Sequence, residues 1–222
     1  MAGRVHELKI LYFLCDLFKK RGYMYKTIDL RSLNAGRHMT EEEIADEQRI
    51  IEASKKEPQV FGRLYDRYYE GIFHFVYRRT DDEELTADLC SQTFLKALQN
   101  LKKYEFRGLP FSAWLFRIAS NEVNKFYNKK KKNRVFSIEE ERVLELFETD
   151  EKEFSQEQVQ LLIKTLKELP TETIEVLELR FFEDRSFKEI AFILNIGESG
   201  AKMRLYRAVE KLKEHFKVNW NE

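Results

Sequence analysis

The sequence has 222 residues, and its 39 Lys and Arg balance its 39 Asp and Glu, so net charge points to no particular partner. Leu, Glu, Lys, Phe and Ile dominate over three prolines and eight glycines, which predicts an all-α protein of one or two domains. The two cysteines, Cys15 and Cys90, lie far apart, which argues against a disulfide framework or a zinc site. We therefore expect no metal and no cofactor.

The first 38 residues contain a short apolar run, from Ile10 to Phe18. Asp16 interrupts this run, which is too short for a membrane span and lacks the small-residue cleavage site of a signal peptide. We therefore expect a cytoplasmic protein that does not contact a membrane. A second start stands at Met39, so residues 1–38 are interpreted as a tag or an upstream translation start. The alternative is a docking or regulatory helix.

Two helices are expected between residues 61 and 101. Phe61 to Tyr77 has a broad apolar face typical of a core helix. Thr80 and Glu83 have the spacing of a capping box, which predicts a helix running to about Leu101 that buries Cys90. Its other face carries a mixed strip of polar and apolar side chains: Asp88, Gln92, Leu95 and Gln99, with Leu89 nearby. This strip is interpreted as a protein interface, and the alternative is an ordinary solvated face.

The segment 106–134 combines an amphipathic helix with a cluster of positive charge. Apolar residues (Phe111, Leu115, Ile118 and Phe126) are expected to face the core, with Trp114 and Ala119 beside them. The opposite face carries the stripe Arg117, Asn121, Asn124 and Asn128. Asparagine is a poor helix former, so three asparagines on one face indicate a role other than helix stability, such as hydrogen bonding to base edges.

The same segment has features of single-stranded nucleic-acid binding. Seven basic residues and one acid lie between Arg117 and Arg134, and such charge neutralises phosphates whatever the base sequence. Three aromatic residues near the stripe are candidates for stacking on unpaired bases: Trp114, Phe116 and Tyr127. The alternative is that these rings are core residues and that the lysines are solvated.

The segments LTADLCSQTFLKAL and FSAWLFRIASNEVNKF resemble the second conserved region of sigma factors of the sigma-70 type, most closely the extracytoplasmic-function branch. The resemblance implies polymerase contacts at Asp88, Leu89, Gln92 and Leu95. It also places Asn121 beside a base pocket that is walled by the loop 104–110. Together with the polar face, the aromatic residues and the positive charge described above, this gives the predicted minus-ten contacts: Trp114, Arg117, Asn121, Asn124, Lys125, Tyr127, Asn128 and Lys129. Lys125 and Asn128 depart from the family pattern, so its base preference is not transferred.

The segment 135–157 is predicted to be an acidic linker, because it holds little sustained apolar periodicity. Residues 158–222 follow as a second domain. Ser186 and Glu189 form a capping box before a short helix, and Asn195 precedes a longer helix from about Ser199 to Phe216. Two helices joined by so tight a turn indicate a helix-turn-helix.

The second domain also resembles the sigma-70 family, in its fourth conserved region, through LKELPTETIEVLELRFFEDRSFKEIAFILNIGESGAKMRLYRAVEKLKE. The last helix is expected to bury Leu205, Ala208, Val209 and Leu212. Its exposed side is expected to contact the minus-thirty-five element: Ser199, Gly200, Lys202, Met203, Arg204 and Arg207. Ile174 and Gly200 depart from the family pattern. We expect Gly200 to move the helix cap to Ser199.

Together these features predict an all-α sigma factor with a first domain at 39–134 and a helix-turn-helix domain at 158–222. Its expected partners are RNA polymerase core, promoter DNA as duplex and as non-template single strand, and an anti-sigma factor. The main alternative is a stand-alone helix-turn-helix regulator that binds duplex DNA without polymerase. An enzyme is not expected, because the sequence has no phosphate-binding glycine loop, metal-binding histidine cluster or nucleophile motif.

Overall fold

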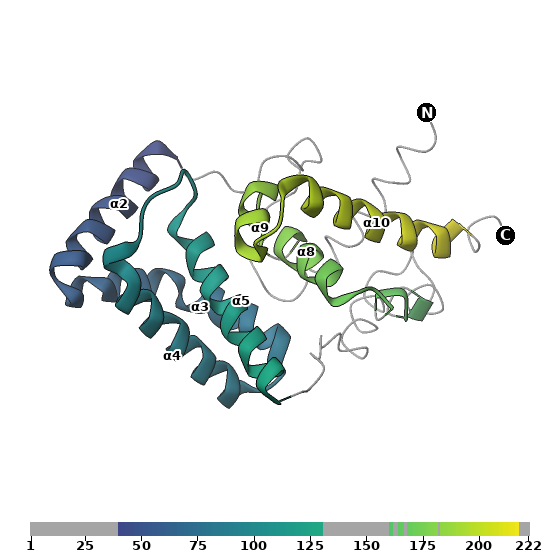
Figure 1. Cartoon of the computed structure of the whole chain (residues 1–222), viewed down its shortest axis with the longest axis horizontal. Helices are drawn as coiled ribbons and strands as arrows, with labels where there is room; N and C mark the ends of the chain where they lie inside the picture. Colours follow the sequence, from purple (N-terminus) through teal and green to yellow (C-terminus); the bar gives the residue numbers. More distant parts are fainter. Residues whose placement is uncertain (1–39, 131–159, 162–163, 167, 182, 218–222) are drawn as a thin grey trace, which may run out of the picture. The chain divides into compact units, whose positions relative to one another are not determined.

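The computed structural model describes residues 40–130, 160–161, 164–166, 168–181 and 183–217 (Figure 1). Every regular element in these ranges is a helix, which confirms the all-α fold. The chain divides into two compact units, one centred on helices α2 to α5 and the other on helices α8 to α10. The predicted extension 1–38, the basic residues 131–134 and the linker 135–157 lie outside the described residues.

Helix α2 (Glu41–Lys56) opens the first unit and was not predicted from the sequence. Its amino end is a complete capping box, in which Glu43 N–H donates to Thr40 Oγ1 (3.1 Å) and Thr40 N–H donates to Glu43 Oε2 (2.8 Å). Ile50 and Ile51 are buried, so the helix is part of the core of this unit.

The rest of the first unit is a bundle of α3 (Gly62–Thr80), α4 (Glu83–Asn100) and α5 (Phe111–Lys130), which pack against one another (Figure 1). Two short 3-10 helices lie between these elements: η2 (Pro58–Phe61) between α2 and α3, and η3 (Leu101–Lys103) between α4 and α5. The core consists of fully buried apolar side chains: Leu64, Ile72, Phe75, Val76, Cys90, Ala97, Phe111, Leu115, Ala119 and Val123. Cys90 is a free, buried thiol, as expected of a small core residue.

The turn between α3 and α4 differs from the prediction of a Thr80–Glu83 box. Helix α3 runs to Thr80 and ends at Asp81, whose φ of 51° is left-handed. Asp82 is the N-cap of α4, because its backbone is extended and its side chain accepts from Leu85 N–H at 3.0 Å. The Thr80 hydroxyl instead lies 2.6 Å from that of Thr86 and helps to join the two helices.

The second unit contains α8 (Thr171–Phe181), α9 (Phe187–Leu194) and α10 (Glu198–Lys217), with α9 and α10 forming the predicted helix-turn-helix. Asn195 adopts a left-handed conformation between them, with φ of 56°. The expectation that Ser199 caps α10 is wrong. The Gly197 carbonyl already accepts from Ala201 N–H at 3.0 Å, so Ser199 lies inside the first turn.

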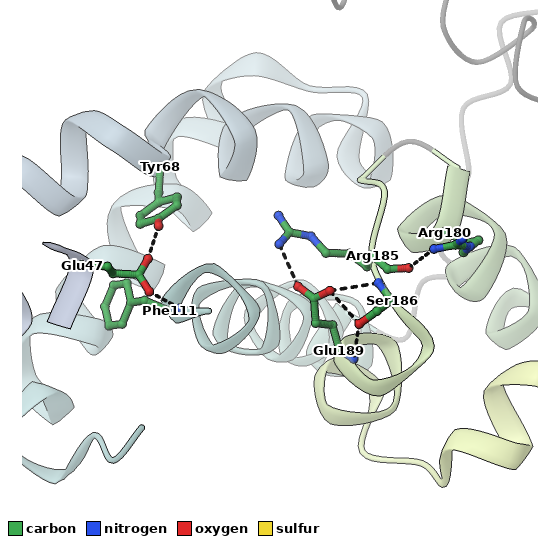
Figure 2. A network of polar contacts seen from close by, with 7 residues as sticks. All are labelled: Glu47, Tyr68, Phe111, Arg180, Arg185, Ser186 and Glu189. Carbon is green, nitrogen blue, oxygen red and sulfur yellow. Dashed lines mark hydrogen bonds and ion pairs between the residues drawn. The ribbon is translucent and has the colours of Figure 1, made fainter. Parts of the chain in front are cut away.

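A polar network holds the start of the helix-turn-helix (Figure 2). The predicted capping box is present: Ser186 N–H donates to Glu189 Oε2 (2.9 Å) and Glu189 N–H donates to Ser186 Oγ (3.3 Å). Arg185 pairs with the same carboxylate at 3.2 Å, and Arg180 Nη1 donates to the Arg185 carbonyl at 2.7 Å. These bonds fix the loop between α8 and α9.

The part of the chain that is described contains no helix long and apolar enough to cross a membrane. Within the same residues, no group of three or more His, Cys, Asp and Glu side chains is arranged to hold a metal ion.

Candidate nucleic-acid interface

Helix α5 has a packed face on one side and a polar face on the other. Leu115, Ala119 and Val123 are fully buried, and they mark the centre of the packed face. Asn121 and Asn128 are exposed on the opposite side. At 100° per residue, Arg117 and Asn124 lie on this side too, so the four residues form one stripe along the helix, hereafter the polar stripe.

The members of the polar stripe differ in exposure. Arg117 and Asn124 are half-buried, and the Asn124 side-chain Oδ1 is buried with no hydrogen-bond partner among the described residues. Asn121 and Asn128 instead reach solvent. The exposed pair is therefore better placed to form hydrogen bonds with a bound strand.

Two aromatic side chains predicted to stack on bases lie in the core instead. The ring of Phe116 packs edge to face against that of Phe75, with 4.8 Å between the ring centres. Tyr127 is 6% exposed, and its hydroxyl donates to the Arg79 carbonyl at 2.8 Å. The packed face of α5 is rotated from the predicted one, because small residues such as Ala119 contribute to it. Ile118 and Phe126 are accordingly only half-buried.

A hollow of about 380 Å³ lies beside the polar stripe, within the first unit. It is bounded by the end of α4, η3 and α5, through Lys96, Asn100, Lys103, Trp114, Ile118, Asn121, Glu122 and Lys125. Glu122 is 5% exposed and pairs with Lys96 and, at 3.3 Å, with Lys125. Three lysines around one buried carboxylate leave the hollow with a net positive charge, which suits a polyanion.

The loop 104–110 leads into α5 and supports Trp114. Gly108 has φ of 68°, a conformation that favours glycine. The Trp114 ring lies 5.0 Å from the ring of Tyr104 and 5.3 Å from that of Phe111. Since the ring also lines the hollow, it presents a supported aromatic surface next to Asn121.

The amino end of α5 is held by a buried carboxylate from α2, which sequence reasoning missed. Phe111 N–H donates to Glu47 Oε2 at 3.0 Å, and the Tyr68 hydroxyl donates to the other carboxylate oxygen (Figure 2). Burial, together with the nearby Glu47 charge, raises the pKa of Tyr68 above its usual range. The same two causes raise the pKa of Tyr104 to about 12. The Thr40–Glu43 box was the available signal for α2, but nothing local pairs Glu47 with Phe111.

The outward face of α4 carries three of the four predicted polymerase contacts. Asp88 and Gln92 are exposed, and Leu95 is 55% exposed. Leu89 is 3% exposed, so the structure corrects its placement on this surface. One residue along a helix turns the side chain by 100°, which carries Leu89 away from Asp88 and into the core.

The outward face of α10 is the second candidate surface. Ser199, Met203 and Arg207 are exposed, while Gly200, Lys202 and Arg204 are half-buried. Lys202 Nζ pairs with Glu198 at 2.7 Å and lies 5.6 Å from the centre of the Phe187 ring. Tyr206 is 60% exposed and was not among the predicted contacts, although its position three residues after Met203 places it on a neighbouring part of the helix surface. The predicted buried residues Leu205, Ala208 and Val209 are confirmed, and the Leu212 side chain lies outside the described residues.

Known proteins match both units. Residues 64–133 match the family described as Sigma-70 region 2, and residues 160–212 match Sigma-70, region 4. The ECF RNA polymerase sigma factor BldN of Streptomyces coelicolor is 31% identical over 179 residues, which cover 76% of this chain and 66% of that protein. The RNA polymerase sigma factor YlaC of Bacillus subtilis is 32% identical over 162 residues, which cover 68% of this chain and 89% of that protein.

The fold has a counterpart among solved structures. In the structure of CnrH in complex with the cytosolic domain of CnrY, the matching chain has a TM-score of 0.55 at 24% identity, covering 79% of this chain and 99% of that chain. This likeness shows the fold alone. Given the two matched regions and the curated relatives, the chain belongs to the sigma-70 family of RNA polymerase sigma factors, in its extracytoplasmic-function group.

Proposed function

We propose that this sigma factor binds RNA polymerase core and directs promoter-specific initiation by capturing the unpaired non-template strand on α5. The observation that carries the proposal is the geometry of α5, whose exposed Asn121 lies opposite a fully packed face and beside a lysine-lined hollow. An outward stripe of amides next to a supported tryptophan matches the needs of single-strand binding.

Strand capture by this surface shifts DNA toward the melted state. Bases that leave the duplex regain stacking on Trp114 and hydrogen bonds to Asn121 and Asn128, which offsets an unpairing cost of a few kcal/mol. Arg117, Lys125 and Lys129 supply positive charge for the phosphates. This role involves no bond chemistry by the protein, so we propose that the chain is not an enzyme.

The outward face of α4 is the proposed polymerase contact. Asp88, Gln92 and Leu95 combine polar groups with an exposed apolar side chain, a composition that suits a protein interface. Leu89 is excluded from this proposal because it is buried. Since the partner is the transcribing polymerase, we place the protein in the cytoplasm.

The outward face of α10 is the proposed contact for the minus-thirty-five duplex. Arg204 and Arg207 suit phosphates or guanine edges, and Met203 is suited to apolar contact with a base edge. Ser199, Gly200 and Lys202 lie at the amino end of the same helix, the end that enters the major groove in helix-turn-helix proteins. An anti-sigma factor is a further proposed partner, since the family resemblance implies one.

Run-off transcription from a promoter library tests the function as a whole. Core polymerase is incubated with each template, with and without the full chain, and start sites dependent on the chain are expected. Their absence, combined with a duplex shift by the chain alone, would replace this proposal with that of a stand-alone regulator.

Two matched variants separate the proposed contacts. Asn121→Ala is expected to reduce permanganate reactivity of unpaired thymines at a library promoter, while polymerase binding stays unchanged. Gln92→Ala is expected to weaken polymerase binding and, at saturating protein, to leave permanganate reactivity intact. Identical behaviour of the two variants in both assays would overturn the assignment of separate surfaces.

A further inference from the structure

Helix α2 lies before the segment that matches Sigma-70 region 2, yet it contacts α5, the helix that carries the polar stripe. Its Glu47 carboxylate is completely buried. One oxygen accepts from the first backbone N–H of α5, that of Phe111, at 3.0 Å, and the other accepts from the Tyr68 hydroxyl (Figure 2). Both oxygens are therefore used, and the carboxylate is fixed from two sides.

A second contact from α2 reaches the loop before α5. Lys55 Nζ donates to the Tyr104 carbonyl at 3.1 Å, and the Tyr104 ring lies 5.0 Å from that of Trp114. The first turn of α5 and its loop are thus tied to α2 at Phe111 and at Tyr104. Trp114 lies one turn after Phe111, and its ring contacts the rings of Phe111 and Tyr104, the two residues that are tied to α2.

We propose that Glu47 is a positioning residue for strand capture, acting through the amino end of α5. A carboxylate at this end satisfies an N–H that has no partner inside the helix and interacts favourably with the helix dipole. By fixing this end of α5, Glu47 positions Trp114 and the polar stripe for contact with unpaired bases. Helix α2 is then a working part of the DNA-capture unit. The inference rests on the proposed role of α5.

The test uses holoenzyme assembled from the full chain, with forked DNA copied from a promoter found in the run-off library. The fork carries 2-aminopurine at the unpaired minus-ten position, so its fluorescence reports base capture. Glu47→Ala removes the cap and is expected to weaken forked-DNA binding about tenfold. Glu47→Gln keeps an acceptor for Phe111 N–H and is expected to remain within about twofold of wild type. Polymerase affinity is expected to stay constant in both.

Asp46→Ala is the matched control on the same helix. Asp46 pairs with Arg67 at 3.0 Å on the surface and forms no hydrogen bond or ion pair with the described side chains of α5, so its loss is expected to leave capture unchanged. If Glu47→Ala does not fold, Tyr68→Phe decides the question, because it frees one carboxylate oxygen while the cap remains. A reduced 2-aminopurine signal with full polymerase binding supports positioning.

Equal loss of polymerase and DNA binding in the variants, or no loss in either, would show that Glu47 is only structural. The absence of a 2-aminopurine response with the wild-type chain would instead refute the proposed function of α5. The two failures are therefore distinguishable.

Discussion

The hydroxyl of Tyr127 donates a hydrogen bond of 2.8 Å to the backbone carbonyl of Arg79, joining α5 to the last turn of α3. This bond is buried, and it turns the Tyr127 ring away from the surface on which single-strand binding is proposed. The ring therefore belongs to the framework behind the polar stripe. Of the three aromatic residues predicted to stack on bases, Trp114 remains beside the polar stripe, where it lines the hollow with Asn121.

Tyr127→Phe is expected to destabilise the chain by about 1 kcal/mol, because it removes one buried hydrogen bond. Urea unfolding followed by circular dichroism measures this loss. Capture of forked DNA at temperatures where the variant is folded is expected to match wild type. Reduced capture of forked DNA without reduced stability would indicate that Tyr127 contacts the DNA.

Leu95 and Leu89 are expected to behave oppositely, although both lie on α4. Leu95→Ala removes an exposed side chain and is expected to weaken polymerase binding about tenfold, with a stability change within about 0.5 kcal/mol. Leu89→Ala opens a cavity and is expected to cost about 2–5 kcal/mol of stability. Polymerase titration and thermal unfolding of both variants check this, and a stable, binding-deficient Leu89→Ala would contradict it.

Arg207→Ala is expected to weaken binding of minus-thirty-five duplex by holoenzyme and to lower the slope of log affinity against log salt by about 1. Lys211→Ala is the control on the same helix, because Lys211 pairs with Glu168 at 3.6 Å. It is expected to leave the slope close to wild type. The slopes are measured from duplex binding at a series of salt concentrations. Equal slopes for wild type and Arg207→Ala would count against a contact between Arg207 and a phosphate.

The free energy of unfolding is expected to fall at alkaline pH, because two buried groups of the first unit have raised pKa values in the folded chain. Burial raises the pKa of Cys90 from 9.0 to about 12 and, with the Glu47 charge, raises the pKa of Tyr104 from 10.0 to about 12. The unfolded chain then loses these protons at lower pH than the folded chain, so their stabilisation is complete below about pH 9 and declines toward pH 12.

Urea unfolding at a series of pH values between 7.5 and 10.5 measures this decline. Cys90→Ala is expected to be less stable than wild type at neutral pH but to lose less stability between pH 9 and 10. Parallel stability curves for the two chains would show that the buried thiol does not contribute to the alkaline decline.

The parts of the fold that follow a helical period could be predicted from the sequence. The polar stripe of α5 and the buried side of α10 are examples, because a period of 3.6 residues fixes which side chains share a face. The period could not set how far each buried face extends. Leu89 is buried one residue from exposed Asp88. Phe111 and Leu115 are buried as expected, but Ala119 and Val123 complete the packed face in place of Ile118 and Phe126, which are half-buried.

Contacts between distant segments could not be predicted in this way. The cap that Glu47 places on α5 involves two ordinary residues on different helices, and neither has a local signal for the other. The same limit applies to Tyr127, whose partner Arg79 lies on another helix. In both cases the fold decides whether a polar side chain serves the surface or the interior.

The Glu47–Phe111 hydrogen bond spans 64 positions in the chain, which has a consequence for folding during synthesis. At roughly 5–20 residues per second, the ribosome makes Phe111 several seconds after Glu47. Neighbouring helices such as α3 and α4 can pair in the meantime, since contacts between nearby segments lose less chain entropy. The amino end of α5 is therefore expected to gain protection from hydrogen exchange late, when α2, made first, finally meets its partner.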